Sequence, residues 1–211
     1  MELHDYRKDY QNAPLLEENI DKNPFKQFEI WFKEAEKAGV YEPNAFNLAT
    51  CNKNGDPSCR VVLLKEFSED GFIFFTNYES KKASDILENP NVAINFFWAE
   101  IHRQVRISGK VEKISLIKSE EYFRSRPVGS QIGAIASKQS HLLLDRNELD
   151  LNYKALEEKY TNEIIPMPNN WGGYIVKPTY FEFWQGRSSR LHDRIVFEKV
   201  ASNWNISRLY P

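Results

Sequence analysis

The feature that most constrains the fold of this chain is a series of short segments in which apolar and polar residues alternate, joined by brief turns. Alternation with period two is typical of strands that bury one face. The first two segments flank Asn54 and Gly55, a strong hairpin signal. The segments lie at residues 46–50, 58–66, 72–76, 92–98, 103–111, 171–176, 195–199 and 204–209. Roughly eight strands, mostly connected by hairpins, predict a closed antiparallel barrel rather than a doubly wound sheet.

Helical spacing and helix caps lie between these strands. We expect helices from Pro24 to a stop at Gly39, and at residues 80–88, 119–126 and 146–160. The chain is therefore predicted to be mainly β with flanking helices. Residues 24–211 are expected to form a single domain, preceded by a polar, flexible N-terminal arm at residues 1–23.

Charge and hydropathy narrow the function classes. Lys plus Arg number 28 against 30 for Asp plus Glu, a net charge of -2, which argues against a general binder of nucleic acids or membrane surfaces. The polar N-terminus and the lack of a long apolar run predict a cytoplasmic protein without membrane spans. Cys51 and Cys59 lack metal-site spacing and are expected to be buried thiols, so no metal is predicted.

The start of the short helix at residues 80–88 points to an anionic ligand. Ser80 is a good N-cap, but Lys81 and Lys82 follow in the first turn, where the helix dipole disfavours cations. A phosphate docked at this N-terminus would resolve the conflict, because it accepts from backbone N–H groups while the lysines neutralise it.

The stretch at residues 181–194 also suggests a ligand. An aromatic strand leads into a turn at which Gly186 is expected to supply a positive φ. Alternation after the turn places Arg190, His192 and Arg194 on one face, where the like charges need an anionic or electron-rich partner. With Trp184 as a flat wall nearby, these cations suit a planar, phosphorylated ligand, although such a short motif by itself also fits a solvated edge strand.

Glu182-Phe-Trp-Gln185 followed by Arg190-Leu-His-Asp-Arg194 resembles the C-terminal signature of the pyridoxamine 5'-phosphate oxidase family. Two further motifs are similar to that family: the run from Arg60 to Lys65, and the Y-x-x-x-R-x-x-x-S pattern of residues 122–130. The resemblance spans nearly the whole chain. It departs at Lys81, where the family usually has Arg, and at Phe75, where Tyr is frequent.

The resemblance implies an FMN-binding split β-barrel, antiparallel, that forms a homodimer with FMN at the subunit interface. The FMN contacts that it implies are Arg60, Val61, Val62, Leu63, Leu64, Lys65, Phe75, Thr76, Lys81, Lys82, Gln104, Gln139, Ser140, Trp184 and Arg194. In a regular strand Arg60 and Lys65, five residues apart, would point to opposite faces. For Gln104, the residues alone equally suit an ordinary surface glutamine.

The implied reaction is oxidation of pyridoxamine or pyridoxine 5'-phosphate to pyridoxal 5'-phosphate by O2, giving H2O2, and ammonia from the amine, in vitamin B6 biosynthesis or salvage. Arg190 and His192 are the implied catalytic residues. The implied substrate contacts are Arg7, Lys8, Asp9, Tyr10, Lys65, Tyr122, Arg126, Ser130, Arg190, Leu191 and His192. The first four belong to a lid. Lys65, Tyr122, Arg126 and Ser130 would clamp the substrate phosphate, with Ser130 in a loop after Pro127, although spacing alone equally fits a helix that ends in a dipole-complementing Arg.

Two other functions fit parts of this pattern. A flavin, haem or phosphate-ligand carrier would need the cofactor cations but not the clamp together with Arg190 and His192. A flavin reductase that uses a nicotinamide donor would respond to that donor and not to pyridoxamine phosphate. Because both halves of the site are present, the sequence favours the oxidase.

Overall fold

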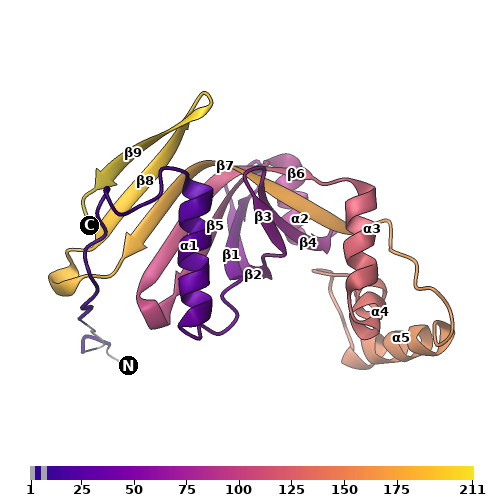
Figure 1. Ribbon diagram of the computed structural model, residues 1–211. Helices are drawn as coiled ribbons and strands as arrows, with labels where there is room; N and C mark the ends of the chain where they lie inside the picture. The colour runs from indigo at the N-terminus through magenta and orange to yellow at the C-terminus, as the bar shows by residue number, and fades with distance from the viewer. Residues whose placement is uncertain (1–2, 6–8) are drawn as a thin grey trace.

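The computed structural model describes residues 3–5 and 9–211, and in this part of the chain nine strands form one antiparallel sheet (Figure 1). The strands are β1 (Ala45–Cys51), β2 (Pro57–Leu63), β3 (Glu66–Ser68), β4 (Gly71–Asn77), β5 (Asn91–Trp98), β6 (Arg103–Lys113), β7 (Trp171–Gln185), β8 (Asp193–Val200) and β9 (Asn203–Leu209). Their order is β2-β1-β5-β6-β7-β4-β3, and β8 pairs with β7 and β9. The mainly antiparallel β prediction is confirmed.

The chain passes from one edge of the curved sheet to the other just after β2. Leu64 N–H donates to Asn44 O beside β1, whereas Lys65 N–H donates to Ile73 O on β4. The expected strand at residues 58–66 is therefore two strands, β2 and β3, with a break at Leu64 and Lys65. This break removes the strict alternation on which the opposite-face prediction for Arg60 and Lys65 depended.

The longest strand, β7, runs from the α3 end of the molecule to the β8–β9 hairpin at the other end (Figure 1). Its residues 174–185 pair with the whole length of β6, with a register shift between Ser108 and Gly109. Pro178 lies opposite Gly109, where the irregular ladder tolerates a residue without an N–H.

The predicted helix from Pro24 is confirmed as α1 (Pro24–Lys37), and its apolar face packs against aromatic side chains of the strands. Phe28 is fully buried with its ring 5.0 Å from that of Phe72. Leu15 and Ile20 are buried in the same core, so this part of the expected arm packs as part of the domain.

The other helices are α2 (Lys81–Glu88), α3 (Leu116–Ser125), α4 (Val128–Ala136) and α5 (Arg146–Lys159). Helix α3 begins earlier than expected because Ser115, not Ser119, is its N-cap and accepts from Lys118 N–H. Pro127 ends α3 as predicted, but it also starts α4, so Ser130 lies in a helix and not in a loop. Figure 1 shows α3, α4 and α5 together at one end of the sheet.

Two further expectations concern the cysteines and the membrane. Cys59 is exposed on β2 and Cys51 is half-buried, so the prediction of two buried thiols is wrong. The reason is that β2 lies at the edge of the ladder and turns Cys59 outward. Among the described helices, none combines the length and the hydropathy needed to cross a membrane.

Candidate active site

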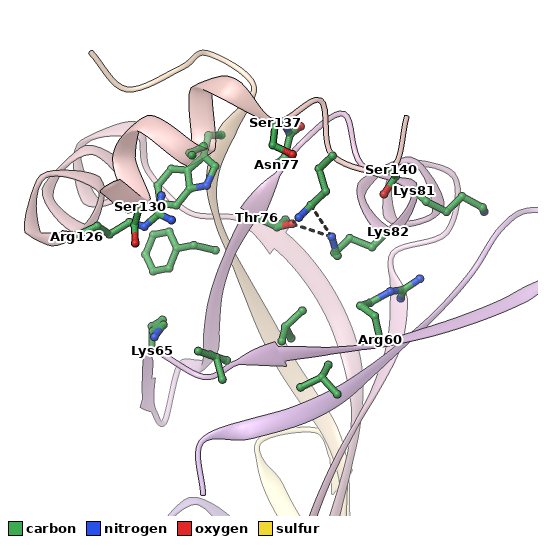
Figure 2. A pocket seen from close by; sticks show the side chains of 18 of the residues that line it. Arg60, Lys65, Thr76, Asn77, Lys81, Lys82, Arg126, Ser130, Ser137 and Ser140 are labelled. Carbon is green, nitrogen blue, oxygen red and sulfur yellow. Dashed lines mark hydrogen bonds between the residues drawn. The ribbon is translucent and has the colours of Figure 1, made fainter. Parts of the chain in front are cut away.

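A cavity of about 940 Å³ lies between β2, β4, α2, α4 and the loop after α4. Figure 2 shows basic side chains on two opposite sides of it: Arg60, Lys81 and Lys82 at one end, Lys65 and Arg126 at the other. We call these the cationic end and the clamp end. The break after β2 brings Arg60 and Lys65 to one cavity, contrary to the expectation for a regular strand.

The cationic end is built around Lys82, which is 7% exposed. Its Nζ donates to Gln139 Oε1 at 2.8 Å, to Thr76 Oγ1 at 3.0 Å and to Ser80 Oγ at 3.2 Å (Figure 2). These partners are uncharged. Burial, and secondarily the charge of Arg60, lower the pKa of Lys82 to about 8. A buried cation held only by neutral oxygens would gain from an anion in the cavity.

The other two cations share a buried carboxylate. Asp85, 1% exposed, lies 4.0 Å from Arg60 Nη2, forms an ion pair with Lys81 and accepts from Thr50 Oγ1 at 2.7 Å. Burial by itself raises the pKa of Asp85, but the hydrogen bonds from Lys81 and Thr50 and the charges of Lys81 and Arg60 outweigh it and hold the pKa below its usual range. Asp85 therefore stays ionised and fixes Lys81.

The N-terminus of α2 differs from expectation in one respect. Ser80 occupies the N-cap position, but its hydroxyl donates to Asn77 O at 2.7 Å and does not cap the helix. No acidic residue lies in the first turn. The negative charge of Asp85, one helical turn later, compensates the positive charge of Lys81. The predicted unfavourable interaction between a lysine and the helix dipole therefore concerns Lys82.

The clamp end has an aromatic wall. Tyr122 stacks on Phe75 with centroids 3.9 Å apart, and Trp171 lies parallel at 5.5 Å from Phe75. The Arg126 guanidinium lies 4.8 Å from the centre of the Trp171 ring, and burial lowers its pKa. Arg126 Nη1 is buried without a hydrogen-bond partner among the described residues. Such an orphaned donor marks the place for an anion's oxygen atoms.

Most of the expected cofactor contacts line this cavity. They are Arg60, Val61, Val62, Leu63, Lys65, Phe75, Thr76, Lys81, Lys82, Gln139 and Ser140, and the expected clamp residues Tyr122, Arg126 and Ser130 line it too. Leu64 is buried in the core instead. Gln104, Trp184 and Arg194 lie on another part of the sheet, where they sit directly opposite one another on β6, β7 and β8.

The remaining expected residues meet at the turn between β7 and β8. Trp184 and His192 have ring centroids 4.7 Å apart, and Tyr10 lies 4.4 Å from His102 and 5.9 Å from His192. Asp9 Oδ1 accepts from Ser189 N–H at 3.1 Å. We call Tyr10, His102, Trp184 and His192 the hairpin cluster. Arg7 and Lys8, also expected in the lid, lie outside the described residues.

His192 has a defined hydrogen-bonding role. Arg187 N–H donates to its Nδ1 at 3.0 Å, so the neutral ring carries its proton on Nε2. Burial, and then the nearby charge of Arg190, lower the pKa of His192. The neutral form with Nε2 as a donor is thereby favoured.

Two expectations about this turn are wrong. Strand β8 begins at Asp193, and Arg190 lies in a 3-10 turn (Ser188–Arg190) with φ 60°, so Arg190 and His192 do not alternate along one strand. The positive φ falls on Ser189 and Arg190, not on Gly186. Gly186 is required for space, because a Cβ there would lie 2.7 Å from Tyr10 Cδ2.

The cavity and the hairpin cluster are far apart within one chain. Trp171 lines the cavity at the start of β7, and Trp184 lies thirteen residues further along the same strand. At about 3.3 Å per residue this is roughly 40 Å along the strand. One small molecule cannot contact the clamp and His192 of the same chain.

The sequence reasoning missed several residues of these sites: Asp85, His102, Trp171 and Glu182. For two of these residues the sequence contains a pattern that indicates the contact. Asp85 follows Lys81 by four residues, the spacing of a helical ion pair. Glu182 shares the Trp184 face of β7 by alternation. For His102 and Trp171 no local pattern indicated a role, because their neighbours come from distant segments.

Two family models match the chain. One described as pyridoxamine 5'-phosphate oxidase matches residues 32–160, and one described as the pyridoxine 5'-phosphate oxidase C-terminal dimerisation region matches residues 171–211. Relatives named pyridoxine/pyridoxamine 5'-phosphate oxidase include one from Aliarcobacter butzleri, 51% identical over 212 residues, and one from Crocosphaera subtropica, 50% identical over 214 residues. Both alignments cover 100% of each chain.

Solved structures share the fold. PhzG from Burkholderia lata 383, in complex with tetrahydrophenazine-1-carboxylic acid, has a TM-score of 0.90 and 28% identity, and the match covers 95% of this chain and 99% of that one. A pyridoxamine 5'-phosphate oxidase-related, FMN binding protein from Nostoc punctiforme has a TM-score of 0.71 and 16% identity, covering 91% and 100%. The expected split barrel is thereby confirmed.

Proposed function

Because the chain belongs to the pyridoxamine 5'-phosphate oxidase family, we propose that it is an FMN-dependent oxidase that converts pyridoxamine or pyridoxine 5'-phosphate to pyridoxal 5'-phosphate. The observation that carries the proposal is the cavity with cations at both ends and an aromatic wall. Such a cavity suits two phosphorylated, planar molecules lying together.

FMN fits the cationic end. Its phosphate would be held by Arg60, Lys81 and Lys82 beside the N-terminus of α2, where Lys82 has only neutral partners. Lys81 provides one point charge where the family usually has a forked guanidinium. The ionised Asp85 keeps this lysine in place.

The substrate phosphate fits the clamp end. Arg126 would meet it with its unpartnered Nη1, and Lys65, Tyr122 and Ser130 line the same end of the cavity. The contact of Arg126 with the Trp171 ring would restrain the guanidinium before the phosphate arrives. The clamp would therefore hold substrate and transition state alike.

The match to a C-terminal dimerisation region indicates a homodimer. We place FMN at the subunit interface, with the cavity of one protomer completed by the hairpin cluster, Arg190 and Leu191 of its partner. The separation of roughly 40 Å along β7 supports this arrangement, since no single chain can surround the substrate.

When bound, FMN would supply the acceptor for a hydride from the exocyclic carbon of the substrate, with O2 as the final electron acceptor and H2O2 as the product. His192 would donate from Nε2 to the ring oxygen of the substrate, and Arg190 would hold the substrate near its reacting carbon. Tyr10 and Asp9, with Arg7 and Lys8, would close the site against water. Water then releases ammonia from the oxidised amine, a step that serves vitamin B6 biosynthesis or salvage.

Anaerobic mixing of the FMN-loaded protein with pyridoxamine 5'-phosphate tests this function. We expect the flavin absorbance to bleach, and to recover with peroxide and aldehyde when air is admitted. Bound flavin that bleaches with neither phosphorylated vitamer would contradict the oxidase and favour a carrier. Rapid bleaching by a reduced nicotinamide, with none by pyridoxamine 5'-phosphate, would instead identify a flavin reductase.

A further inference from the structure

A buried carboxylate lies beside the row formed by Gln104, Trp184 and Arg194. Two residues further along, the same face carries Arg106 on β6 opposite Glu182 on β7. Glu182 is 1% exposed, whereas Arg106 is half-exposed. A carboxylate that is buried this deeply stays ionised only if its oxygens are fully hydrogen-bonded.

The hydrogen bonds of Glu182 meet this requirement. Its Oε1 accepts from Arg194 Nε at 2.9 Å. Its Oε2 accepts from Arg194 Nη2, Arg106 Nη1 and the Tyr180 hydroxyl, each at 3.0 Å. Burial alone raises the pKa of Glu182, but the hydrogen bonds from Arg194 and Tyr180 and the charges of the two arginines outweigh it and leave the pKa below its ordinary value.

These bonds fix the plane of the Arg194 guanidinium. Glu182 binds it through Nε and Nη2, and Nη1 donates to Tyr210 O at 2.9 Å. Three of its five N–H groups are used in this way, so the other two remain to donate to a ligand in a fixed direction. Trp184 lies directly opposite Arg194 on the neighbouring strand.

The balance of charges around Glu182 also favours a fixed orientation of Arg194. One carboxylate between two guanidiniums leaves a single net positive charge beside Trp184. If Glu182 were neutral, Arg106 and Arg194 would repel each other and Arg194 would lose the bidentate contact that orients it.

We propose that Glu182 is a positioning residue for the cofactor: it holds Arg194 in the orientation in which its remaining N–H groups bind FMN, and so sets the affinity for FMN. This inference rests on the proposed function together with the FMN contact that the family resemblance implies for Arg194. It assigns to the family motif's glutamate an action through Arg194 and not a contact with substrate.

Glu182→Gln tests the proposal, because it keeps the size of the side chain and removes the charge. The FMN dissociation constant, measured by flavin fluorescence during titration of the cofactor-free protein, is expected to rise on the order of tenfold. Arg194→Gln should also weaken binding, and the double variant should bind no more weakly than Arg194→Gln alone. The matched control is Glu112→Gln, which removes an exposed carboxylate paired with Lys177 at 2.7 Å on the same two strands.

Unchanged FMN affinity in Glu182→Gln, or losses that simply add in the double variant, would overturn the positioning role. A native chain that does not bind FMN would overturn the proposed function as well, so the two failures are distinguishable. Should Glu182→Gln not fold, Tyr180→Phe removes one donor to Oε2 and leaves the charges of Glu182, Arg106 and Arg194 in place. That variant is expected to weaken FMN binding two- to fivefold, roughly the effect of one hydrogen bond, and an unaltered affinity would contradict the proposal.

Discussion

At the scale of single residues, burial decides the chemistry of Lys82. Its pKa of about 8, against an ordinary 10.5, means that the folded, ligand-free protein releases this proton between those pH values while the unfolded chain keeps it. The contribution of Lys82 to the free energy of unfolding therefore increases with pH across that window. A bound phosphate reverses the preference, because it stabilises the ammonium form.

We expect FMN binding to weaken above pH 8 for this reason. The dissociation constant should rise with pH by at most about tenfold per pH unit, since one proton is involved. In Lys82→Arg the guanidinium stays charged, so the dependence on pH should disappear. Titrations of the cofactor-free protein between pH 7 and pH 10 measure this, and an identical pH profile in both proteins would contradict it.

Arg126 should control the affinity for substrate more than the rate of the reaction. Arg126→Ala removes the buried, unpartnered Nη1 and the guanidinium on Trp171, and is expected to raise KM on the order of a hundredfold with a smaller change in kcat. Arg124→Ala is the control, because Arg124 lies in the last turn of α3, two residues before Arg126, is half-exposed and pairs with Glu120. Steady-state kinetics with pyridoxine 5'-phosphate compare the two variants. If Arg126→Ala has the same KM as Arg124→Ala, Arg126 does not take part in the clamp.

At the scale of elements, the path of β7 depends on the irregularity opposite Pro178. A Cβ at Gly109 would lie 2.1 Å from Lys177 O, a backbone atom that cannot move aside easily. This close approach explains the glycine, whose φ is not in the left-handed region. Without it the β6–β7 ladder could not change register where the proline removes a donor.

Gly109→Ala is therefore expected to lower the free energy of unfolding by about 2 kcal/mol, the typical cost of overpacking. Gly133→Ala is the matched control: it lies in α4 with open space around a Cβ, and should be neutral or stabilising by about 0.5–1 kcal/mol. Urea unfolding of the two cofactor-free variants provides the comparison. A Gly109→Ala protein as stable as the native one would show that the strands relax without cost.

At the scale of the whole molecule, the separation of the cavity from the hairpin cluster predicts complementation between subunits. Arg126→Ala disables the clamp and His192→Ala disables the other half. If each site takes one half from each protomer, a mixed dimer has one intact site and one doubly altered site. Random mixing of the two variants should then recover about a quarter of the native activity.

The experiment requires exchange of subunits, for example by unfolding and refolding the mixed variants together. Each variant refolded alone is the control and should stay nearly inactive when the substrate concentration is far below the raised KM of Arg126→Ala. A mixture that is no more active than the separate variants would place each complete site within one chain and would contradict the shared site.

The sequence by itself determined the antiparallel strands, the hairpins and the position of the short helix α2 with lysines in its first turn, because these depend on periodicity and on neighbours along the chain. The motifs also identified Arg60, Lys65 and Arg126 as candidate site residues. Only the tertiary structure decided how these residues group, since strand pairing brings together segments far apart in the sequence. The break after β2 places Lys65 in the lining of the same cavity as Arg60.

Tertiary contacts likewise assigned Gly186 to making room for Tyr10, and joined Glu182 to Arg106 and Arg194. Burial and electrostatic coupling arise between strands, so no spacing along the chain specifies them. For the same reason the length of β7, and not any motif, separates the cavity from the hairpin cluster by roughly 40 Å within one chain.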